Sequence, residues 1–263
     1  MNLYKNKTIL VTGASSGIGE AFAIELNKLG ANLVLTARSE DKLNTIAAKM
    51  NNAIVISGDL SDEKFPLFLY KSIKEKNIKI DIVINNAGFG FSGLFLDSPV
   101  KNYKEMMNLN MYSLVELTHL FMKDMVDEKN GGIINISSLA SFQPMPYFSI
   151  YAATKAFVTS FTIGLYEEYR DKNIRVLGVC PGYTKTNFNK RAVMKNNNHA
   201  AGYIMTAEAV VKQSLKAYAK NKYIIINGFN NKLSKLLLNI LPQRISLKIT
   251  KMILRKGVEK GQW

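Results

Sequence analysis

Tyr151 and Lys155 are the residues whose types and spacing first suggest chemistry. They lie four residues apart, so on a helix the phenol and the ammonium share one face. A free tyrosine has a pKa of about 10, and a cation held beside it favours the phenolate and lowers that pKa. The pair could then serve as a general acid/base for an alkoxide. The same spacing also fits a surface tyrosine beside a solvated lysine, unless other segments supply a cofactor, an oxyanion donor and a pocket.

A glycine-rich stretch near the N-terminus predicts a nucleotide site. Its spacing is Gly-x-x-x-Gly-x-Gly, and it lies between a strand pattern and a helix pattern. Glycines let backbone N–H groups approach a pyrophosphate, and the positive end of the following helix favours negative charge. The residues expected to bind the cofactor in this stretch are Gly13, Ser15, Ser16, Gly17, Ile18 and Gly19.

The end of the second predicted strand favours NADP(H). An NAD site normally has an acidic residue there for the ribose hydroxyls, whereas this chain has Thr36, Ala37 and Arg38. A guanidinium in place of a carboxylate suits a 2′-phosphate. Arg38 could otherwise be a solvent-exposed residue at the start of a helix.

Strand and helix patterns alternate along most of the chain. Apolar, β-rich runs predict strands at 8–11, 32–36, 53–57, 80–85, 132–137, 174–179 and 223–226. Helical spacing predicts helices at 19–29, 40–50, about 62–76, roughly 100–127 and around Tyr151. Strands this apolar have no face suited to water. We therefore predict an α/β fold: a Rossmann-like, doubly wound parallel sheet of about seven strands in three α/β/α layers, with a C-terminal helical extension.

Composition sets the broad class of protein. The 263 residues are 47% hydrophobic and 21% charged, as in a soluble globular protein. Cys180 is the one cysteine, and no signal peptide or long apolar span is visible, so we expect a cytoplasmic protein. The net charge of +15 suggests affinity for polyanions, although a general enrichment in lysine would also produce it. We find no zinc-ligand spacing or RNA-binding signature, so we expect no metal and no nucleic acid partner.

Together, these segments resemble the short-chain dehydrogenase/reductase family over about residues 7–186. Besides the glycine-rich loop and the Tyr-x-x-x-Lys pair, five other motifs occur in the family's order. Asp59 and Leu60 resemble its adenine-contacting pair, and residues 85–88 resemble its Asn-Asn-Ala-Gly motif. The resemblance implies NADP(H) contacts from Asp59, Leu60, Asn86, Ala87, Gly88, Tyr151, Lys155, Pro181, Gly182, Thr184 and Thr186.

The resemblance also implies a catalytic tetrad of Asn110, Ser138, Tyr151 and Lys155. Ser138 would orient the substrate carbonyl, and Tyr151 would donate a proton as hydride arrives from the nicotinamide. Lys155 would lower the phenol pKa and bind the nicotinamide ribose, while Asn110 would hold a water that connects Lys155 to solvent. Ser137 is the nearest rival for the serine role, and spacing favours Ser138. An alternative from another class is an idle NADP(H)-binding sensor or membrane-associated scaffold.

Aromatic and apolar residues follow the strands that should carry the site, which favours a small lipophilic ketone, aldehyde or alcohol as substrate. They are Phe89, Phe91, Phe95, Phe142, Pro144, Met145, Tyr147, Tyr183, Phe188 and Met194. Individually, each fits ordinary core packing equally well. Residues 185–203 could form a mobile lid beside them. The family implies a homodimer or homotetramer.

The C-terminal segment is basic and amphipathic. Residues 229–258 contain seven basic residues and no acidic one, and Pro242 divides the segment into two predicted helices. Such helices can lie on an anionic membrane, or their apolar faces can cover the substrate pocket or a partner subunit. We assign 1–228 to one catalytic domain. Residues 229–263 form an extension that either belongs to that domain or contacts a membrane or partner.

Overall fold

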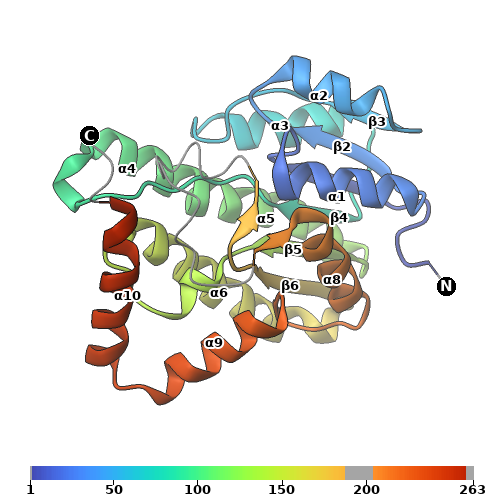
Figure 1. Ribbon diagram of the computed structural model, residues 1–263. Coiled ribbons are helices and arrows are strands. Elements are labelled where there is room, and N and C mark those ends of the chain that lie inside the picture. The colour runs from blue at the N-terminus through green and yellow to red at the C-terminus, as the bar shows by residue number, and fades with distance from the viewer. Residues whose placement is uncertain (1, 187–203, 259–263) are drawn as a thin grey trace.

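A seven-stranded parallel sheet forms the centre of the molecule (Figure 1). The structure is a computed structural model that describes residues 2–186 and 204–258. Across the sheet the strands lie in the order β3-β2-β1-β4-β5-β6-β9. Strands β1 to β3 are added towards one edge, and β4, β5, β6 and β9 towards the other, so the order of addition switches between β1 and β4. They are β1 (Thr8–Thr12), β2 (Asn32–Thr36), β3 (Ala53–Val55), β4 (Ile82–Asn85), β5 (Gly131–Ile136), β6 (Ile174–Cys180) and β9 (Ile224–Ile226). The predicted α/β class and number of strands are confirmed.

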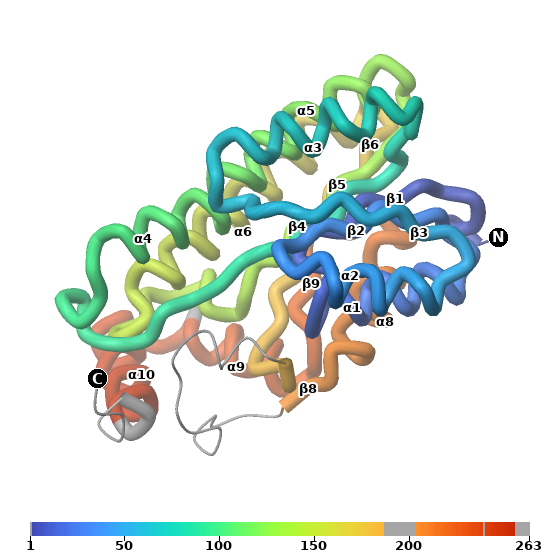
Figure 2. The backbone as a smooth tube through the Cα atoms, turned by 90° about the horizontal axis from the view of Figure 1, so that it is seen from above, coloured from blue at the N-terminus to red at the C-terminus, as the bar shows by residue number. Residues whose placement is uncertain are grey.

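Helices cover both faces of the sheet, as Figure 2 shows from above. One face carries α1 (Gly17–Lys28), α2 (Glu40–Ala47) and α8 (Ala207–Ala219). The other carries α3 (Phe65–Glu75), α5 (Ser113–Asp127) and α6 (Ser149–Tyr169). Alternation along β1 explains the two cores, because Ile9 and Val11 join the first and Leu10 joins the second.

The predicted long helix at 100–127 is wrong in one respect. It is divided into α4 (Val100–Met107), a π-helical turn η2 (Asn108–Tyr112) and α5. The turn coincides with side-chain bonds from Asn110 to the distant backbone of Phe89, which sequence periodicity does not reveal. Short elements were also missed: the 3₁₀ turns η1 (Phe95–Asp97), η3 (Leu139–Phe142) and η4 (Arg170–Lys172), and the paired strands β7 (Thr184–Lys185) and β8 (Met205–Thr206).

The C-terminal segment forms the two helices expected from Pro242. They are α9 (Phe229–Ile240), which lies along the bottom of the view in Figure 1, and α10 (Gln243–Val258), which lies at its left. In the part of the chain that the structure describes, no helix combines the length and apolarity needed to cross a membrane. Most of the segment predicted to form a lid lies outside the described residues.

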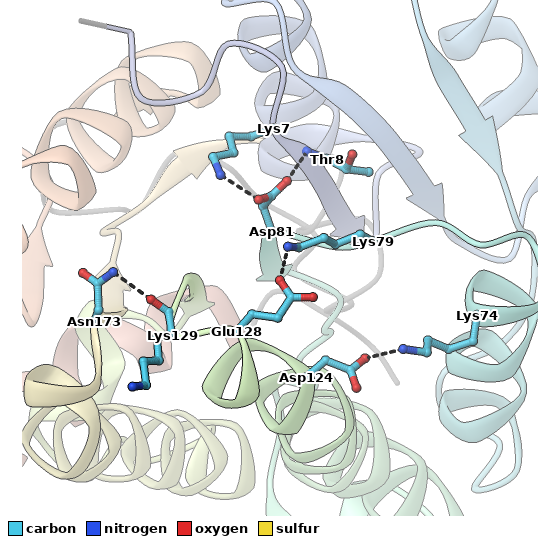
Figure 3. Close-up of polar contacts among 9 residues, drawn as sticks. All are labelled: Lys7, Thr8, Lys74, Lys79, Asp81, Asp124, Glu128, Lys129 and Asn173. Atoms are coloured by element: carbon cyan, nitrogen blue, oxygen red, sulfur yellow. Dashed lines mark hydrogen bonds and ion pairs between the residues drawn. The ribbon is translucent and has the colours of Figure 1, made fainter.

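Asp81 fastens the amino-terminal edge of the sheet (Figure 3). Its carboxylate accepts hydrogen bonds from Lys7 Nζ at 2.7 Å and from the Thr8 backbone N–H at 2.9 Å. Its own backbone N–H donates to Thr8 O, and its carbonyl accepts from the N–H of Gly132. One residue therefore connects the beginnings of β1, β4 and β5.

We predict that Asp81→Ala lowers the free energy of unfolding by about 2–3 kcal/mol, because a backbone donor and a cation both lose a charged acceptor. Urea denaturation measures the change. Glu128→Ala is the matched control, because Glu128 pairs with Lys79 at a more exposed position (Figure 3). This variant should lower the free energy of unfolding by at most about 1 kcal/mol. Equal losses in the two variants would contradict the role given to Asp81.

Candidate active site

Ser138, Tyr151 and Lys155 meet at the carboxyl edge of the sheet. Tyr151 lies in the first turn of α6, and its phenol is hydrogen-bonded to the hydroxyl of Ser138, the N-cap residue immediately before η3. Lys155 lies one turn further along α6 and is buried. Its ammonium donates to Ile136 O at 2.9 Å and lies 5.8 Å from the centre of the Tyr151 ring. The predicted shared helix face is thus present, with a hydroxyl partner for the phenol.

The acid–base properties of this pair differ from the prediction. Burial raises the pKa of Tyr151 to about 12, and the hydrogen bond from Ser138 only partly offsets that rise. Burial also lowers the pKa of Lys155 to about 8. The expected lowering of the phenol pKa by the ammonium is wrong for the chain by itself, because removal from water disfavours both charged forms. At neutral pH the phenol therefore carries its proton.

The two adjacent serines have different surroundings. Ser137 is buried and bonds to the carbonyl of Lys155 at 2.8 Å and to the hydroxyl of Thr159 at 2.7 Å. Ser138 instead accepts from the N–H of Ala140 at 3.1 Å and faces the phenol. Ser138 therefore lies at the site, whereas the hydrogen bonds of Ser137 hold α6 against the end of β5.

Asn110 is held inside the site by three hydrogen bonds. Its amide oxygen accepts from Phe89 N, while its Nδ2 donates to Phe89 O and to the hydroxyl of Thr154. Gly88 fits between Asn110 and Lys155: a Cβ on it would lie 3.0 Å from Asn110 Oδ1 and 3.5 Å from Lys155 Nζ. Thr154 was not among the predicted site residues. Its position one turn after Tyr151, whose carbonyl it contacts at 2.8 Å, was the available signal.

The glycine-rich loop forms a tight cradle between β1 and α1. Gly13 has a positive φ of 65°, and a Cβ on Gly19 would lie 2.3 Å from the carbonyl oxygen of Gly13. Among the described residues, α1 has no side-chain cap at Ser16, so its first N–H groups remain for a ligand. Ser15 and Ile18 complete this loop, and Ile18 packs on the core.

The Asn86 motif fastens this loop to β4. Asn86 Nδ2 donates to Thr12 O at 2.8 Å and to Gly13 O at 3.3 Å. The hydroxyl of Thr12 in turn accepts from the N–H groups of Asn86 and Ala87, both at 2.9 Å. Thr12 was not predicted as a site residue, and its bridging role depends on the spatial pairing of β1 with β4.

Arg38 and Asp59 lie together at the ends of β2 and β3. Arg38 Nη1 is 3.5 Å from Asp59 Oδ2, and both side chains are largely exposed. The other oxygen of Asp59 accepts from the backbone and hydroxyl of Ser61. Leu60 is buried, and its carbonyl accepts a hydrogen bond from Ser113. The guanidinium is therefore available at the strand end, although a carboxylate already neighbours it.

The segment after β6 returns to the loop and to the active site. Pro181 O accepts from the N–H of Leu139, next to Ser138, and Thr184 bonds to the carbonyl of Gly182. A Cβ on Gly17 would touch Thr186 at 3.1 Å, so this segment reaches the glycine-rich loop. The predicted cofactor residues from separate parts of the chain thus border one continuous region.

Some of the predicted aromatic residues line a small pocket of about 10 Å³. Its walls are Phe91, Gly93, Phe95, Tyr103, Tyr147, Ser149 and Ile150. Tyr103, which was not predicted, stacks on Phe95 with ring centres 5.4 Å apart. Phe188 and Met194 lie outside the described residues. A larger hollow, of about 420 Å³, is at the opposite edge beside Asp81 and contains none of the predicted site residues.

Comparison with known proteins decides the family. The short chain dehydrogenase family model matches residues 7–197. The chain belongs to this family. Short-chain dehydrogenases are oxidoreductases that use NAD(P)(H) to interconvert CH–OH and carbonyl groups.

Curated relatives and a solved structure share this similarity. A very-long-chain 3-oxoacyl-CoA reductase of Anas platyrhynchos is 35% identical over 69% of this chain, and the match spans 61% of the relative's length. Mouse 17-beta-hydroxysteroid dehydrogenase type 3 is 33% identical over 90% of this chain and 76% of its own. A short-chain dehydrogenase from Sphingobium yanoikuyae in complex with NADPH has 28% identity and a TM-score of 0.78, with 98% of each chain covered.

The buried Lys155 generates a stability prediction. Its pKa is lowered from 10.5 to about 8, so the unfolded chain binds this proton more tightly than the folded chain. The stability lost by burying the charge is therefore recovered as the pH rises from about 8 towards 10.5. Between pH 7 and pH 9.5 the free energy of unfolding of the wild type should increase by about 2 kcal/mol relative to Lys155→Met.

Urea unfolding of the cofactor-free protein at the two pH values gives this difference. Lys123→Met, which removes an exposed lysine from α5, should differ from the wild type equally at both pH values. A difference between wild type and Lys155→Met that stays constant with pH would show that Lys155 is not desolvated.

Proposed function

We propose that this protein is an NADPH-dependent reductase of a lipophilic ketone or aldehyde, which also oxidises the corresponding alcohol in reverse. The observation that carries this proposal is the hydrogen-bonded pair of Ser138 and Tyr151 above the buried Lys155. Gly88 lies beside Lys155, 3.5 Å from its Nζ at the position of a Cβ, and the preceding Asn86 and Ala87 bond to Thr12 at the start of the glycine-rich loop. Proton-donating groups and a dinucleotide cradle thus share one edge of the sheet.

The residues present fit a dinucleotide. A Cβ on Gly13 or Gly19 would collide with Asn86 or with the loop's own backbone, so both glycines are needed for the tight turn that a dinucleotide loop makes. The start of α1 offers N–H groups to a pyrophosphate. When bound, the reduced nicotinamide supplies the hydride. Tyr151 and Lys155 would border its ribose, and Pro181, Gly182, Thr184 and Thr186 would border its carboxamide and phosphates.

The chain's own residues control the proton. Tyr151 holds its proton at neutral pH, which is the form needed to protonate a carbonyl oxygen as it becomes an alkoxide. The Ser138 hydroxyl would donate to the same oxygen and orient it. Lys155, with a pKa of about 8, is still cationic at pH 7 and would stabilise the phenolate that remains. Asn110 would hold a water that links Lys155 to solvent.

Arg38 supports NADP(H) as the preferred cofactor. It is the charged residue at the end of β2, after Thr36 and Ala37, neither of which is acidic. A 2′-phosphate would give the guanidinium a stronger partner than Asp59, which is exposed and 3.5 Å away. The solved relative bound to NADPH adds support from similarity.

Apolar surroundings and the relatives support a long-chain acyl or steroid-like substrate. Phe91, Phe95, Tyr103 and Tyr147 gather beside the first turn of α6. The relatives are named as a very-long-chain 3-oxoacyl-CoA reductase and a hydroxysteroid dehydrogenase.

We also infer a homodimer or homotetramer through the long helices, because Phe157 and Ile163 are exposed on α6.

Tyr151→Phe tests the catalytic assignment. We expect the rate of NADPH oxidation to fall by roughly 10²–10⁴, because the variant has no phenolic proton to donate, while NADPH binding persists. A screen of aliphatic aldehydes, 3-oxoacyl thioesters and steroid ketones would first identify a substrate. Tyr169→Phe, at the far end of α6, is the control and should retain full activity. Full turnover by Tyr151→Phe would remove the assignment, and NADPH binding without any turnover in the screen would favour an idle binding protein.

Arg38→Ala tests the cofactor preference. The variant should bind NADPH roughly 10–100 times more weakly, because a charged hydrogen bond to the 2′-phosphate is lost, and its affinity for NADH should change by less than about threefold. Fluorescence titration measures both constants. Lys49→Ala removes an exposed charge beyond the end of α2 and should leave both affinities unchanged. Equal weakening for NADPH and NADH would contradict contact with the 2′-phosphate.

A further inference from the structure

Helix α9 places its apolar side chains outward. Phe229, Leu233, Leu236, Leu237 and Ile240 are all exposed, from 46% to 79%. Their spacing of i, i+4, i+7, i+8 and i+11 puts them on one face of the helix. A surface helix of a globular protein ordinarily turns such a face towards the core.

The opposite face of α9 is polar and packs on the catalytic domain. Asn231 is 7% exposed and donates to Asn227 O at 2.7 Å. A Cβ on Gly182 would collide with its amide, so the two residues are in close contact. Lys235 lies with its ammonium 5.5 Å from the centre of the Phe142 ring. These polar contacts, with the half-buried Leu238 beside them, orient α9 so that Leu233, Leu236 and Leu237 lie on the outside.

Helix α10 repeats this arrangement. Ser246 and Thr250 are buried, and Thr250 Oγ1 approaches Gln143 Oε1 at 3.5 Å. Ile245, Ile249 and Met252 are exposed at spacing i, i+4 and i+7. The inward faces combine these polar groups with the half-buried Leu238, Leu247, Ile253 and Leu254. Each helix nevertheless presents a separate apolar stripe outward, which indicates a surface that a partner covers.

The charges around these stripes identify the partner's chemistry. Lys232 is exposed on α9, and Arg244, Lys248 and Lys251 are exposed on α10. The sequence of 229–258 contains no carboxylate. A second copy meeting this surface symmetrically would bring like charges together, which disfavours self-association. An anionic lipid surface instead accepts both the cations and the apolar side chains.

A further apolar segment lies at the same end of the molecule. Leu94, Phe95, Leu96 and Val100 are exposed around η1 and the start of α4. The chain that leads from β4 to α4 passes beside α10 in both views (Figures 1 and 2). Phe95 also lines the small aromatic pocket near Tyr151. The apolar surface thus extends from the two C-terminal helices to the residues that border the predicted substrate site.

We propose that α9 and α10, with the 94–100 segment, dock on an anionic bilayer and hold the active-site entrance at the lipid surface. This proposal rests on the proposed function for its substrate class, because a lipophilic carbonyl compound would then reach Ser138 and Tyr151 from the membrane. The evidence for the docking surface does not depend on turnover. It consists of the burial, the spacing and the charge of the residues on α9, α10 and the 94–100 segment.

Vesicle co-sedimentation tests the surface. The full chain is mixed with vesicles of phosphatidylcholine or of phosphatidylcholine with phosphatidylserine. We expect binding to the anionic vesicles that decreases with added salt. The triple variant Lys232→Glu, Lys248→Glu, Lys251→Glu should bind them at least about tenfold more weakly, and Leu237→Ser with Ile249→Ser should have a similar effect.

A matched triple variant controls for net charge. Lys42→Glu, Lys49→Glu and Lys71→Glu reverse three exposed lysines on or beside α2 and α3, at the other end of the molecule, and should bind within about twofold of wild type. Absent binding to anionic vesicles, or an equal loss in both triple variants, would overturn the proposal. Concentration-dependent self-association that Leu237→Ser abolishes in sedimentation experiments would overturn it as well, in favour of a subunit interface.

Two further measurements separate this proposal from the proposed function. Tyr151→Phe should bind anionic vesicles as the wild type does, whatever its activity. The triple variant on α9 and α10 should keep its rate with a short, water-soluble aldehyde in the absence of vesicles. A triple variant that loses that rate would show damage to the active site and overturn the assignment of these lysines to docking alone.

Discussion

Removal of the Lys155 ammonium from water is the constraint on which the active site depends. A buried cation is stable only where the surroundings give it hydrogen-bond acceptors and a fixed position. Ile136 O provides an acceptor, and the hydroxyl of Ser137 holds the carbonyl of Lys155 itself. These two hydrogen bonds hold the first turns of α6 in a fixed position relative to the end of β5. Because of that fixed position, Ser138, which follows Ser137, meets the phenol of Tyr151.

The same removal from water explains why cofactor and catalysis belong together in this fold. In the chain alone, burial opposes ionisation of both Tyr151 and Lys155. A bound dinucleotide would bring phosphates and ribose hydroxyls to the edge formed by Gly13, Gly88 and Thr186, and would change the electrostatic field at the phenol. Under the proposed function, the acid–base properties that matter would therefore be those of the complex with the cofactor rather than those of the tyrosine–lysine pair alone.

Much of this structure was predictable because the information is local. Apolar runs defined the strands, and the four-residue spacing of Tyr151 and Lys155 predicted a shared helix face that α6 provides. The missing parts depend on distant contacts. The π turn accompanies bonds between Asn110 and Phe89, and the direction of the Tyr151 pKa shift follows from burial that only the folded chain creates. Similarly, the pattern of α9 revealed an amphipathic helix but not which face Asn231 would turn inward.

The π turn at Asn108–Tyr112 has a consequence for the pairing of α4 with α5. An α-helix turns by about 100° per residue, so one extra residue in a turn changes the angular phase of everything that follows. With that offset, Tyr103 and Met106 of α4 and Leu117 and Phe121 of α5 are all buried, while Asn110 still reaches Phe89. A chain shortened by one residue here would form a straight helix. That helix could bury the apolar residues of both α4 and α5, or it could bring Asn110 to Phe89, but it could not do both.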